Sequence, residues 1–294
     1  MGEDRTIGAR QPDQVTQVTQ VVPRGLGAPP HGMVWVPDGF WIDRFPVTNA
    51  AFARFVEATG HVTRAEQVGA SAVFHPPHRG ALRRPGPVAG GWAATPGADW
   101  RHPRGPRTSL RALDGHPVVH VARTDAVAYA DWADRALPTE AEWEGAAWGG
   151  LDGATYPWGD ALEPGGRHMA NVWQGGFPDG NRCLDGFAHT SPQRAFPPNA
   201  YGVFDMVGNV WEWTADRAAP ADPEAGPDAA AHAAACGPPP DGTGGDRGVL
   251  KGGSHLCGPG HCPHASPATR VAQALATPSS HAGFRCVVRV TPAG

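Results

Sequence analysis

The pattern of apolar and polar positions is first informative at residues 33 to 48, MVWVPDGFWIDRFPVT, where short apolar runs are interrupted by Pro37-Asp38-Gly39. This turn pattern between apolar runs predicts two short strands. A helix is predicted directly afterwards. It has Thr48 as its N-cap and Gly60 as its stop, and Phe52, Phe55 and Val56 share one helical face.

The next long stretch has no clear period. Residues 61 to 115 are rich in Gly, Pro and Arg, so we expect an ordered loop anchored by Trp92 and Trp100. The apolar run HPVVHVA, residues 116 to 122, predicts a strand.

Two more helices are predicted after that strand. RTDAVAYADWADRA starts with the candidate N-cap Thr124. PTEAEWEGAAWGG has Thr139 at the N-cap and Glu142 three positions later, which is the pattern of a capping box.

Regular periodicity is lost after Gly150, although aromatic residues persist between frequent turn patterns. Tertiary packing, hydrogen bonds or bound ions must therefore hold this region. Residues 218 to 248 are of low complexity and carry Cys236, which predicts a surface loop. The segment AGFRCVVRV, residues 282 to 290, predicts a last strand.

Composition agrees with a folded chain that has few regular elements. Among 294 residues there are 40 Gly and 32 Pro, yet 11 Trp supply large apolar side chains that a disordered chain lacks. We expect a flexible leader at residues 1 to 30 and a single domain at residues 31 to 294.

The charge pattern disfavours several classes of partner. The net charge is -4 and the pI is near 6.4, with no basic cluster interleaved with aromatics, so no nucleic-acid partner is expected. No signal-peptide pattern and no 18-residue apolar run is present. We therefore expect a cytoplasmic protein that does not contact membranes. Five cysteines in so long a chain do not resemble a disulfide framework.

Two irregular segments carry candidate oxygen ligands. Asp205 and Glu212 bracket a turn containing Gly208, and Asn171 and Asp185 flank a second loop. Carboxylates combined with free backbone carbonyls suit Ca²⁺, whereas Asx-turns and a surface Glu are the alternative. The spacing alone favours the second interpretation.

The segment LKGGSHLCGPGHCPH contains Cys257 and Cys262 in a Gly- and Pro-rich loop. The Cys-x4-Cys spacing is compatible with a disulfide or two structural thiols, with a soft metal, or with redox catalysis. His255, His261 and His264 could complete a zinc site, whereas two thiolates alone suit Cu(I).

Several motifs, taken in order, resemble the formylglycine-generating enzyme family, the sulfatase-modifying factors. They are LPTEAEWEGAAWGG, YPWGD, MANVWQGGFP, FPPNAYGVFDMVGNVWEWTAD, LKGGSHLC and GFRC. The similarity runs from Met33 to Arg289. The cysteine pair after Gly-Gly-Ser is its more specific part, since the LPTEAEWE and GNVWEW segments resemble motifs that also occur in non-oxidising paralogues.

The resemblance implies an α+β fold related to C-type lectins, with low regular secondary structure, many ordered loops and bound Ca²⁺. It also implies a copper-dependent oxidoreductase. Cys257 and Cys262 would bind Cu(I), and O₂ would be used to oxidise a cysteine in a Cys-x-Pro-x-Arg motif of a sulfatase to Cα-formylglycine. Ser254 matches a residue that lines the active site. The sulfatase is expected to be unfolded or nascent, and this chain is expected to be a monomer.

The resemblance also assigns calcium ligands. Asn171, Asp185 and the carbonyls of Val172 and Phe187 would hold one ion. A second ion would be held by Asp205, Glu212 and the carbonyls of Gly208 and Val210.

The chain departs from the family at several positions. Residues 258 to 261 and 263 to 266 differ from the usual sequence around the second cysteine, which affects the expected peptide specificity. Ala130, Ala147 and Pro267 stand where eukaryotic members have disulfide cysteines, so Cys286 is expected to lack a partner. A non-catalytic lectin-like binding module is the alternative function. A sulfoxide synthase is disfavoured because no His-x3-His-x-Glu motif is present.

Overall fold

The computed structural model describes most of the chain from residue 28 to residue 290. The described residues are 28–76, 91–151, 153–178, 180–218, 238, 246–258 and 265–290. The predicted leader up to residue 27, most of the predicted low-complexity loop with Cys236, and Cys262 lie outside them.

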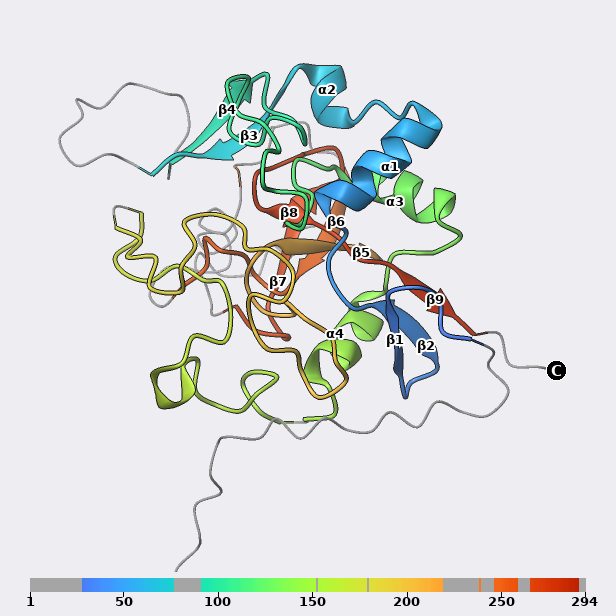
Figure 1. The fold of residues 1–294 in the computed structure, drawn as a ribbon, viewed down its shortest axis with the longest axis vertical. Helices are drawn as coiled ribbons and strands as arrows, with labels where there is room; N and C mark the ends of the chain where they lie inside the picture. Colours follow the sequence, from blue (N-terminus) through green and yellow to red (C-terminus); the bar gives the residue numbers. More distant parts are fainter. Residues whose placement is uncertain are drawn as a thin grey trace, which may run out of the picture.

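Short elements are joined by long irregular segments, as Figure 1 shows. The α-helices are α1 (Asn49–Thr59), α2 (Arg64–Val68), α3 (Arg123–Trp132) and α4 (Glu140–Trp148). The strands are β1 (Met33–Val36), β2 (Phe40–Asp43), β3 (Ala70–Phe74), β4 (Trp92–Pro96), β5 (Trp211–Arg217), β6 (Arg247–Lys251), β7 (Arg270–Ala274), β8 (Ala282–Gly283) and β9 (Val287–Arg289).

The strands form three small sheets. One has the order β1-β2-β9, a second is the β3-β4 hairpin, and the third has the order β7-β6-β5-β8. All neighbouring pairs are antiparallel except β5 and β8, which are parallel. The mixture of helices with mainly antiparallel sheets agrees with the expected α+β class.

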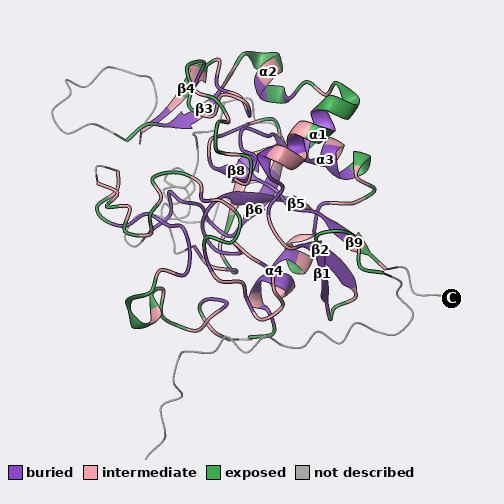
Figure 2. Ribbon diagram, viewed as in Figure 1, coloured by how far each residue is buried: buried purple, intermediate pink, exposed green. Residues whose placement is uncertain are grey.

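The largest hydrophobic core joins α1, α3 and the four-stranded sheet, and α4 packs beneath it. Phe52 of α1, Tyr129 of α3 and Phe284 form a cluster of edge-to-face and stacked rings. Trp143 of α4 packs in a second core with Ile42 of β2. Figure 2 shows that buried residues concentrate where β5, β6 and β8 meet the surrounding loops.

Two of the predicted helices are confirmed with their caps. The Thr48 hydroxyl accepts from the amide of Ala51 at the start of α1, and Gly60 ends that helix with φ of 69°. Thr139 and Glu142 form the predicted capping box of α4. The two strands around the Pro-Asp-Gly turn are confirmed as β1 and β2.

Other predictions are wrong in instructive ways. Residues 61–115 are not only loop, because they contain α2, β3 and β4. Residues 116–122 form no strand. This segment is bent at His120, whose φ is 61°, and it contributes only an isolated bridge between Pro117 and Thr48. The predicted last strand is divided into β8 and β9, which belong to different sheets.

The N-cap of α3 also differs from the prediction. Ala122, not Thr124, occupies the cap position, and the carboxylate of Asp125 accepts from its amide at 2.8 Å. The sequence pattern therefore located the helix correctly but assigned its cap to the wrong residue.

The described residues contain no helix that is both long and apolar enough to cross a membrane. In the described part of residues 151–210, the only helical element is the 3₁₀ turn Pro164–Gly166. The predicted loss of regular structure after Gly150 is confirmed.

Candidate functional site

Cys257 lies in a tight loop directly after β6. Gly252 and Gly253 both have positive φ, at 90° and 80°. A Cβ on Gly253 would lie 2.6 Å from that of Ala265, so only glycine fits. The Cys257 amide then donates to the carbonyl of Ser254 at 2.9 Å, which closes the turn.

The Cys257 side chain is fully enclosed by protein. Its exposed fraction is 1%, and its Sγ lies 3.4 Å from the amide nitrogen of Ser254 and 3.9 Å from the Ser254 Oγ. Burial raises the pKa of the thiol to about 11, and the two contacts with Ser254 oppose this rise. At neutral pH, this sulfur becomes a thiolate readily only when a cation binds it.

A buried cysteine sulfur is a suitable ligand for a soft metal ion such as Cu(I), which would displace the thiol proton on binding. Cys262 is the second predicted ligand. It lies outside the described residues, as do His261 and His264. The His255 ring is oriented by the backbone, since its Nδ1 lies 2.9 Å from the carbonyl oxygen of Asn209. Burial lowers the pKa of His255 to about 3, so the ring is neutral and Nδ1 is the donor.

The four residues of the first predicted calcium site converge. The Asp185 carboxylate accepts from the amides of Val172 at 3.2 Å and Phe187 at 3.0 Å. Asn171 is 1% exposed, and its Oδ1 has no hydrogen-bond partner. A buried oxygen without a donor is costly, and a bound Ca²⁺ would satisfy it. This set therefore fits the implied ion.

Gln174 is part of this loop but has no place in the sequence-based prediction. Its Nε2 donates to the carbonyl of Val172 at 2.6 Å, and its Oε1 accepts from the amide of Asp185. Gln174 thus holds two of the predicted ligand residues together. It directly follows the Asn-Val-Trp sequence, but side-chain type alone gives no signal for this role.

The second predicted calcium set contains a cationic side chain that the sequence interpretation missed. Glu212 is fully buried, and its carboxylate accepts from Arg285 Nε at 2.6 Å, Arg285 Nη2 at 2.7 Å and Trp143 Nε1 at 2.7 Å. Arg285 also donates to the carbonyl of Phe204 at 2.9 Å. The guanidinium already provides positive charge where an ion was expected.

Asp205 adds a second carboxyl group to this set, so the set remains compatible with a bound cation in addition to Arg285. Its backbone has a positive φ of 56°. Burial raises the pKa of its carboxyl to about 7; Arg285 opposes this effect, and the charge of Glu212 adds to it. One guanidinium therefore does not fully compensate two neighbouring carboxylates. The only signal for Arg285 was its place in the motif GFRC.

The predicted loss of the Cys286 partner is confirmed. Cys286 is a free, fully buried thiol in the same hydrophobic core as Ala130. Among the described residues, no group of three or more His, Cys, Asp or Glu side chains is placed to hold a metal ion. The candidate calcium sites thus combine one or two carboxylates with amide or carbonyl oxygens, and the candidate copper site pairs Cys257 with Cys262.

Comparisons with known proteins agree with the resemblance seen in the sequence. The family profile described as "Sulfatase-modifying factor enzyme 1-like domain" matches residues 6–290. A protein from Thermomonospora curvata named formylglycine-generating enzyme is 48% identical over 250 residues, which are 84% of this chain and 81% of the relative.

A mouse relative named inactive C-alpha-formylglycine-generating enzyme 2 is 42% identical over 253 residues, covering 84% of this chain and 74% of the relative. Among solved structures, PvdO from Pseudomonas aeruginosa aligns with a TM-score of 0.52 and 23% identity, over 85% of this chain and 80% of that one. At this identity, PvdO supports the fold alone.

Proposed function

The chain belongs to the sulfatase-modifying factor family, and we propose that it converts a cysteine of a sulfatase polypeptide to Cα-formylglycine. The observation that supports this most directly is the buried Cys257 thiol in its glycine-dependent turn beside Ser254. The proposed substrate motif is Cys-x-Pro-x-Arg, and the proposed acceptor is O₂.

Cys257 and Cys262 would hold Cu(I) as two thiolate ligands. When bound, this ion supplies the redox chemistry that activates O₂ and leaves a side open for the sulfur of the substrate. The proposal is supported by the chemistry of Cys257, whose high pKa favours the thiolate only next to a cation.

The surrounding residues position the sulfur and exclude water from it. The Ser254 amide points toward the Cys257 Sγ, where it stabilises negative charge. The Trp173 amide donates to the Cys257 carbonyl at 2.8 Å, which attaches this loop to the segment after Asn171. A target cysteine must reach this buried position on an extended segment, so an unfolded or nascent substrate is proposed.

Calcium would have a structural role in the loops next to the one that carries Cys257. Asn171, Val172, Asp185 and Phe187 would hold one ion, and the unpaired Asn171 Oδ1 supports that assignment. Asp205, Gly208, Val210 and Glu212 would hold a second ion beside Arg285.

The experiment is to incubate the copper-loaded protein with a Cys-x-Pro-x-Arg peptide in air and to measure the aldehyde product by mass spectrometry. Wild type should form the aldehyde, and C257A and C262A should lose it. The matched control is C183A, since Cys183 is a partly exposed free thiol, and it should retain activity. No product with wild type, or undiminished product with C257A, would contradict the proposed function.

A non-catalytic binding module is the second candidate, and the similarity to a mouse relative named as inactive supports it. It predicts peptide binding without aldehyde formation at any copper concentration. The same experiment separates the two functions when binding is measured in parallel.

A further inference from the structure

A cavity of about 250 Å³ lies beside the loop that carries Cys257. His255 and Leu256, the two residues before Cys257, line it, and so does Trp173, whose amide binds the Cys257 carbonyl. A molecule bound in this cavity would thus lie against the backbone that holds the proposed catalytic sulfur.

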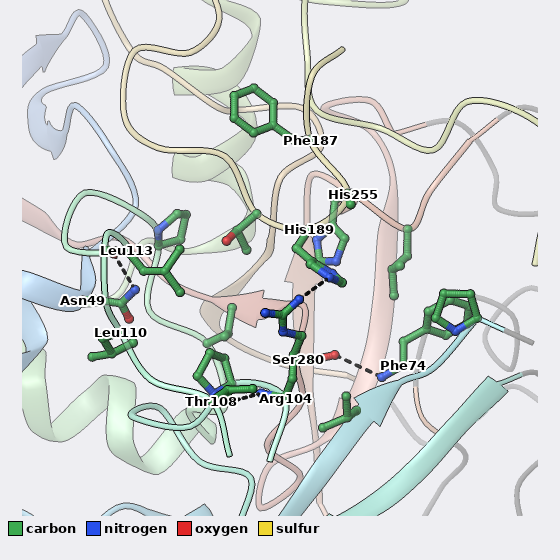
Figure 3. Close-up of a pocket in the computed structure, with 18 of the residues that line it drawn as sticks. Asn49, Phe74, Arg104, Thr108, Leu110, Leu113, Phe187, His189, His255 and Ser280 are labelled. Atoms are coloured by element: carbon green, nitrogen blue, oxygen red, sulfur yellow. Dashed lines mark hydrogen bonds between the residues drawn. The ribbon is translucent and has the colours of Figure 1, made fainter. Parts of the chain in front are cut away.

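The walls of the cavity are mainly apolar and come from several segments of the chain. Figure 3 shows Leu110 and Leu113 around Asn49 at one end, Phe74 and Ser280 at the other, and Arg104 and His189 between them. Walls of this kind suit an aliphatic or aromatic group.

The charge of the cavity has one sign. No Asp or Glu occurs among the described residues that line it, whereas Arg104 lies at its rim. Arg104 Nη1 donates to His189 Nε2 at 3.0 Å, and the remaining guanidinium donors are available to a ligand.

The cavity also contains an unpaired polar atom. Asn49 is 4% exposed, and while its Nδ2 donates to the Leu113 carbonyl at 2.8 Å, its Oδ1 has no partner. A ligand that carries an N–H group, as a peptide does, would satisfy this acceptor. Apolar walls, a cationic rim and a buried acceptor together describe a peptide subsite.

We propose that this cavity receives an apolar side chain of the substrate polypeptide close to the target cysteine, and that Arg104 pairs with an acidic residue beside it. The inference rests on the proposed function and adds a substrate preference to it. The arginine of the Cys-x-Pro-x-Arg motif binds elsewhere, because the described lining of the cavity offers it no carboxylate.

The test uses matched peptides that differ only in the residues flanking the motif. Each flanking position carries Glu or Lys in one series, and Leu or Ser in another. R104E is compared with R107E, because Arg107 is exposed on the same segment but does not line the cavity. Binding is measured by fluorescence anisotropy with peptides in which the target cysteine is Ser, and turnover is measured as aldehyde formation with the Cys peptides.

Wild type and R107E should bind the Glu peptide about tenfold more tightly than the Lys peptide at one flanking position, the order expected for one charge-assisted hydrogen bond. R104E should reverse this preference, and Leu should bind more tightly than Ser at a neighbouring position. An equal preference in R104E and wild type would overturn the inference. Charge-dependent binding without any aldehyde would contradict the proposed function and leave the subsite standing.

Discussion

At the scale of single residues, the carboxyl of Asp43 should make the free energy of unfolding depend on pH. Burial raises the pKa of its carboxyl to about 6, although Arg135 and the amide of Cys286 oppose the rise. A carboxyl with a raised pKa binds its proton more tightly in the folded state. It therefore contributes stability that is present at acid pH and is lost as pH rises from about 4 to about 6.

The variant D43N removes this titration. The free energy of unfolding of wild type, relative to D43N, should fall by about 2.4 kcal/mol between pH 4 and pH 7, with most of the change complete by pH 6. Urea denaturation at a series of pH values measures both proteins. Parallel pH profiles would show that the carboxyl of Asp43 does not titrate in this range.

Ser254 supports the turn that presents Cys257. Its Oγ accepts from the Leu256 amide at 3.2 Å, and both groups are buried. In S254A that amide loses its partner, which should reduce stability by about 1–3 kcal/mol and lower the rate of aldehyde formation. T59A is the control, since its hydroxyl donates to the Phe55 carbonyl at 2.8 Å at the end of α1, outside the proposed site. Equal rates of aldehyde formation in both variants would show that Ser254 does not contribute to the reaction.

The identities of the site residues could be predicted from the sequence only where they belong to local motifs. Cys257 and Ser254 lie within one short segment, and Asn171 and Asp185 flank one loop. Arg285, in contrast, meets Glu212 across 73 positions of the chain, and no periodic pattern indicates that pairing. Long-range ion pairs are set by the fold and cannot be derived from spacing.

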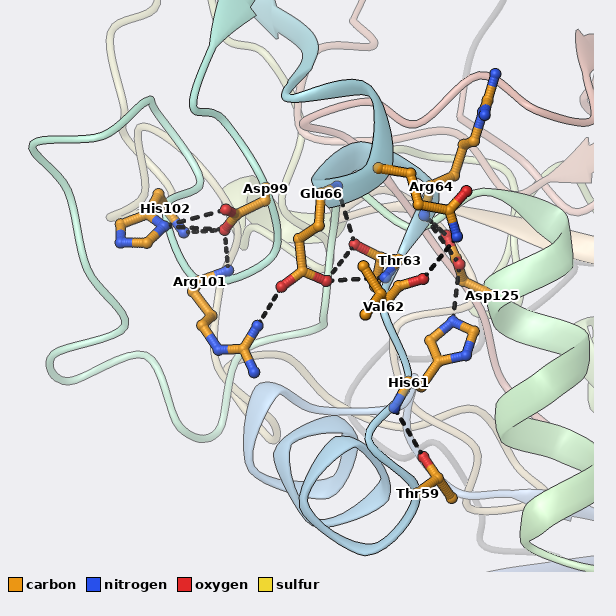
Figure 4. A network of polar contacts seen from close by, with 11 residues as sticks. Thr59, His61, Val62, Thr63, Arg64, Glu66, Asp99, Arg101, His102 and Asp125 are labelled. Atoms are coloured by element: carbon orange, nitrogen blue, oxygen red, sulfur yellow. Dashed lines mark hydrogen bonds and ion pairs between the residues drawn. The ribbon is translucent and has the colours of Figure 1, made fainter.

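At the scale of secondary-structure elements, Asp125 joins α3 to α2 and to the loop before α2. Figure 4 shows its carboxylate between His61 and the start of α2. It accepts from the amide of Arg64 at 3.1 Å and from the amide of Ala122 at 2.8 Å, and it pairs with His61 at 2.9 Å. One side chain thus caps α3 and connects it to the N-terminus of α2.

The variant D125A should lower the free energy of unfolding by about 2–4 kcal/mol, because it removes a cap and leaves buried amides without an acceptor. D131A, on the exposed side of the same helix, should change it by less than about 0.5 kcal/mol. Urea denaturation followed by circular dichroism measures both. Similar midpoints for the two variants would show that Asp125 is not a structural junction.

The elements that were predicted correctly are determined by interactions between residues close in sequence. Those that were missed are determined by contacts between distant residues. Thr139 and Glu142 form their capping box within a single helical turn, so four residues suffice to predict it. The segment 116–122 is apolar like a strand, yet His120 turns inward with a positive φ and bonds to Ser71 and the carbonyl of Pro103. Those partners are distant in sequence, and they determine the backbone there.

At the scale of the whole molecule, the irregular half of the chain depends on side-chain contacts instead of backbone ladders. Asn209 is an example: its Oδ1 accepts from Ser191, its amide donates to Asn171, and its carbonyl accepts from His255. This residue connects the first predicted calcium loop to the loop of Cys257. The resemblance to a family predicted the fold class, whereas such cross-connections required the structure.

This connection predicts that calcium stabilises the molecule as a whole. Bound at a hundred times its Kd, one ion would add about 2.7 kcal/mol, which for a chain of this size corresponds to roughly 4–5 °C in melting temperature. Differential scanning fluorimetry with CaCl₂ and with EGTA measures the shift. Mg²⁺ should give little of it, since that smaller ion gives up its water reluctantly and is poorly suited to a site built mainly of protein oxygens.

Variants at the two predicted sites assign the effect. N171A should abolish most of the shift, because it removes the buried oxygen that has no other partner. D205A should retain the larger part of it, since Arg285 already provides positive charge at the second set. A full shift in N171A together with none in D205A would reverse the assignment. An absent shift in wild type would mean that hydrogen bonds such as those of Gln174 hold the loop without an ion.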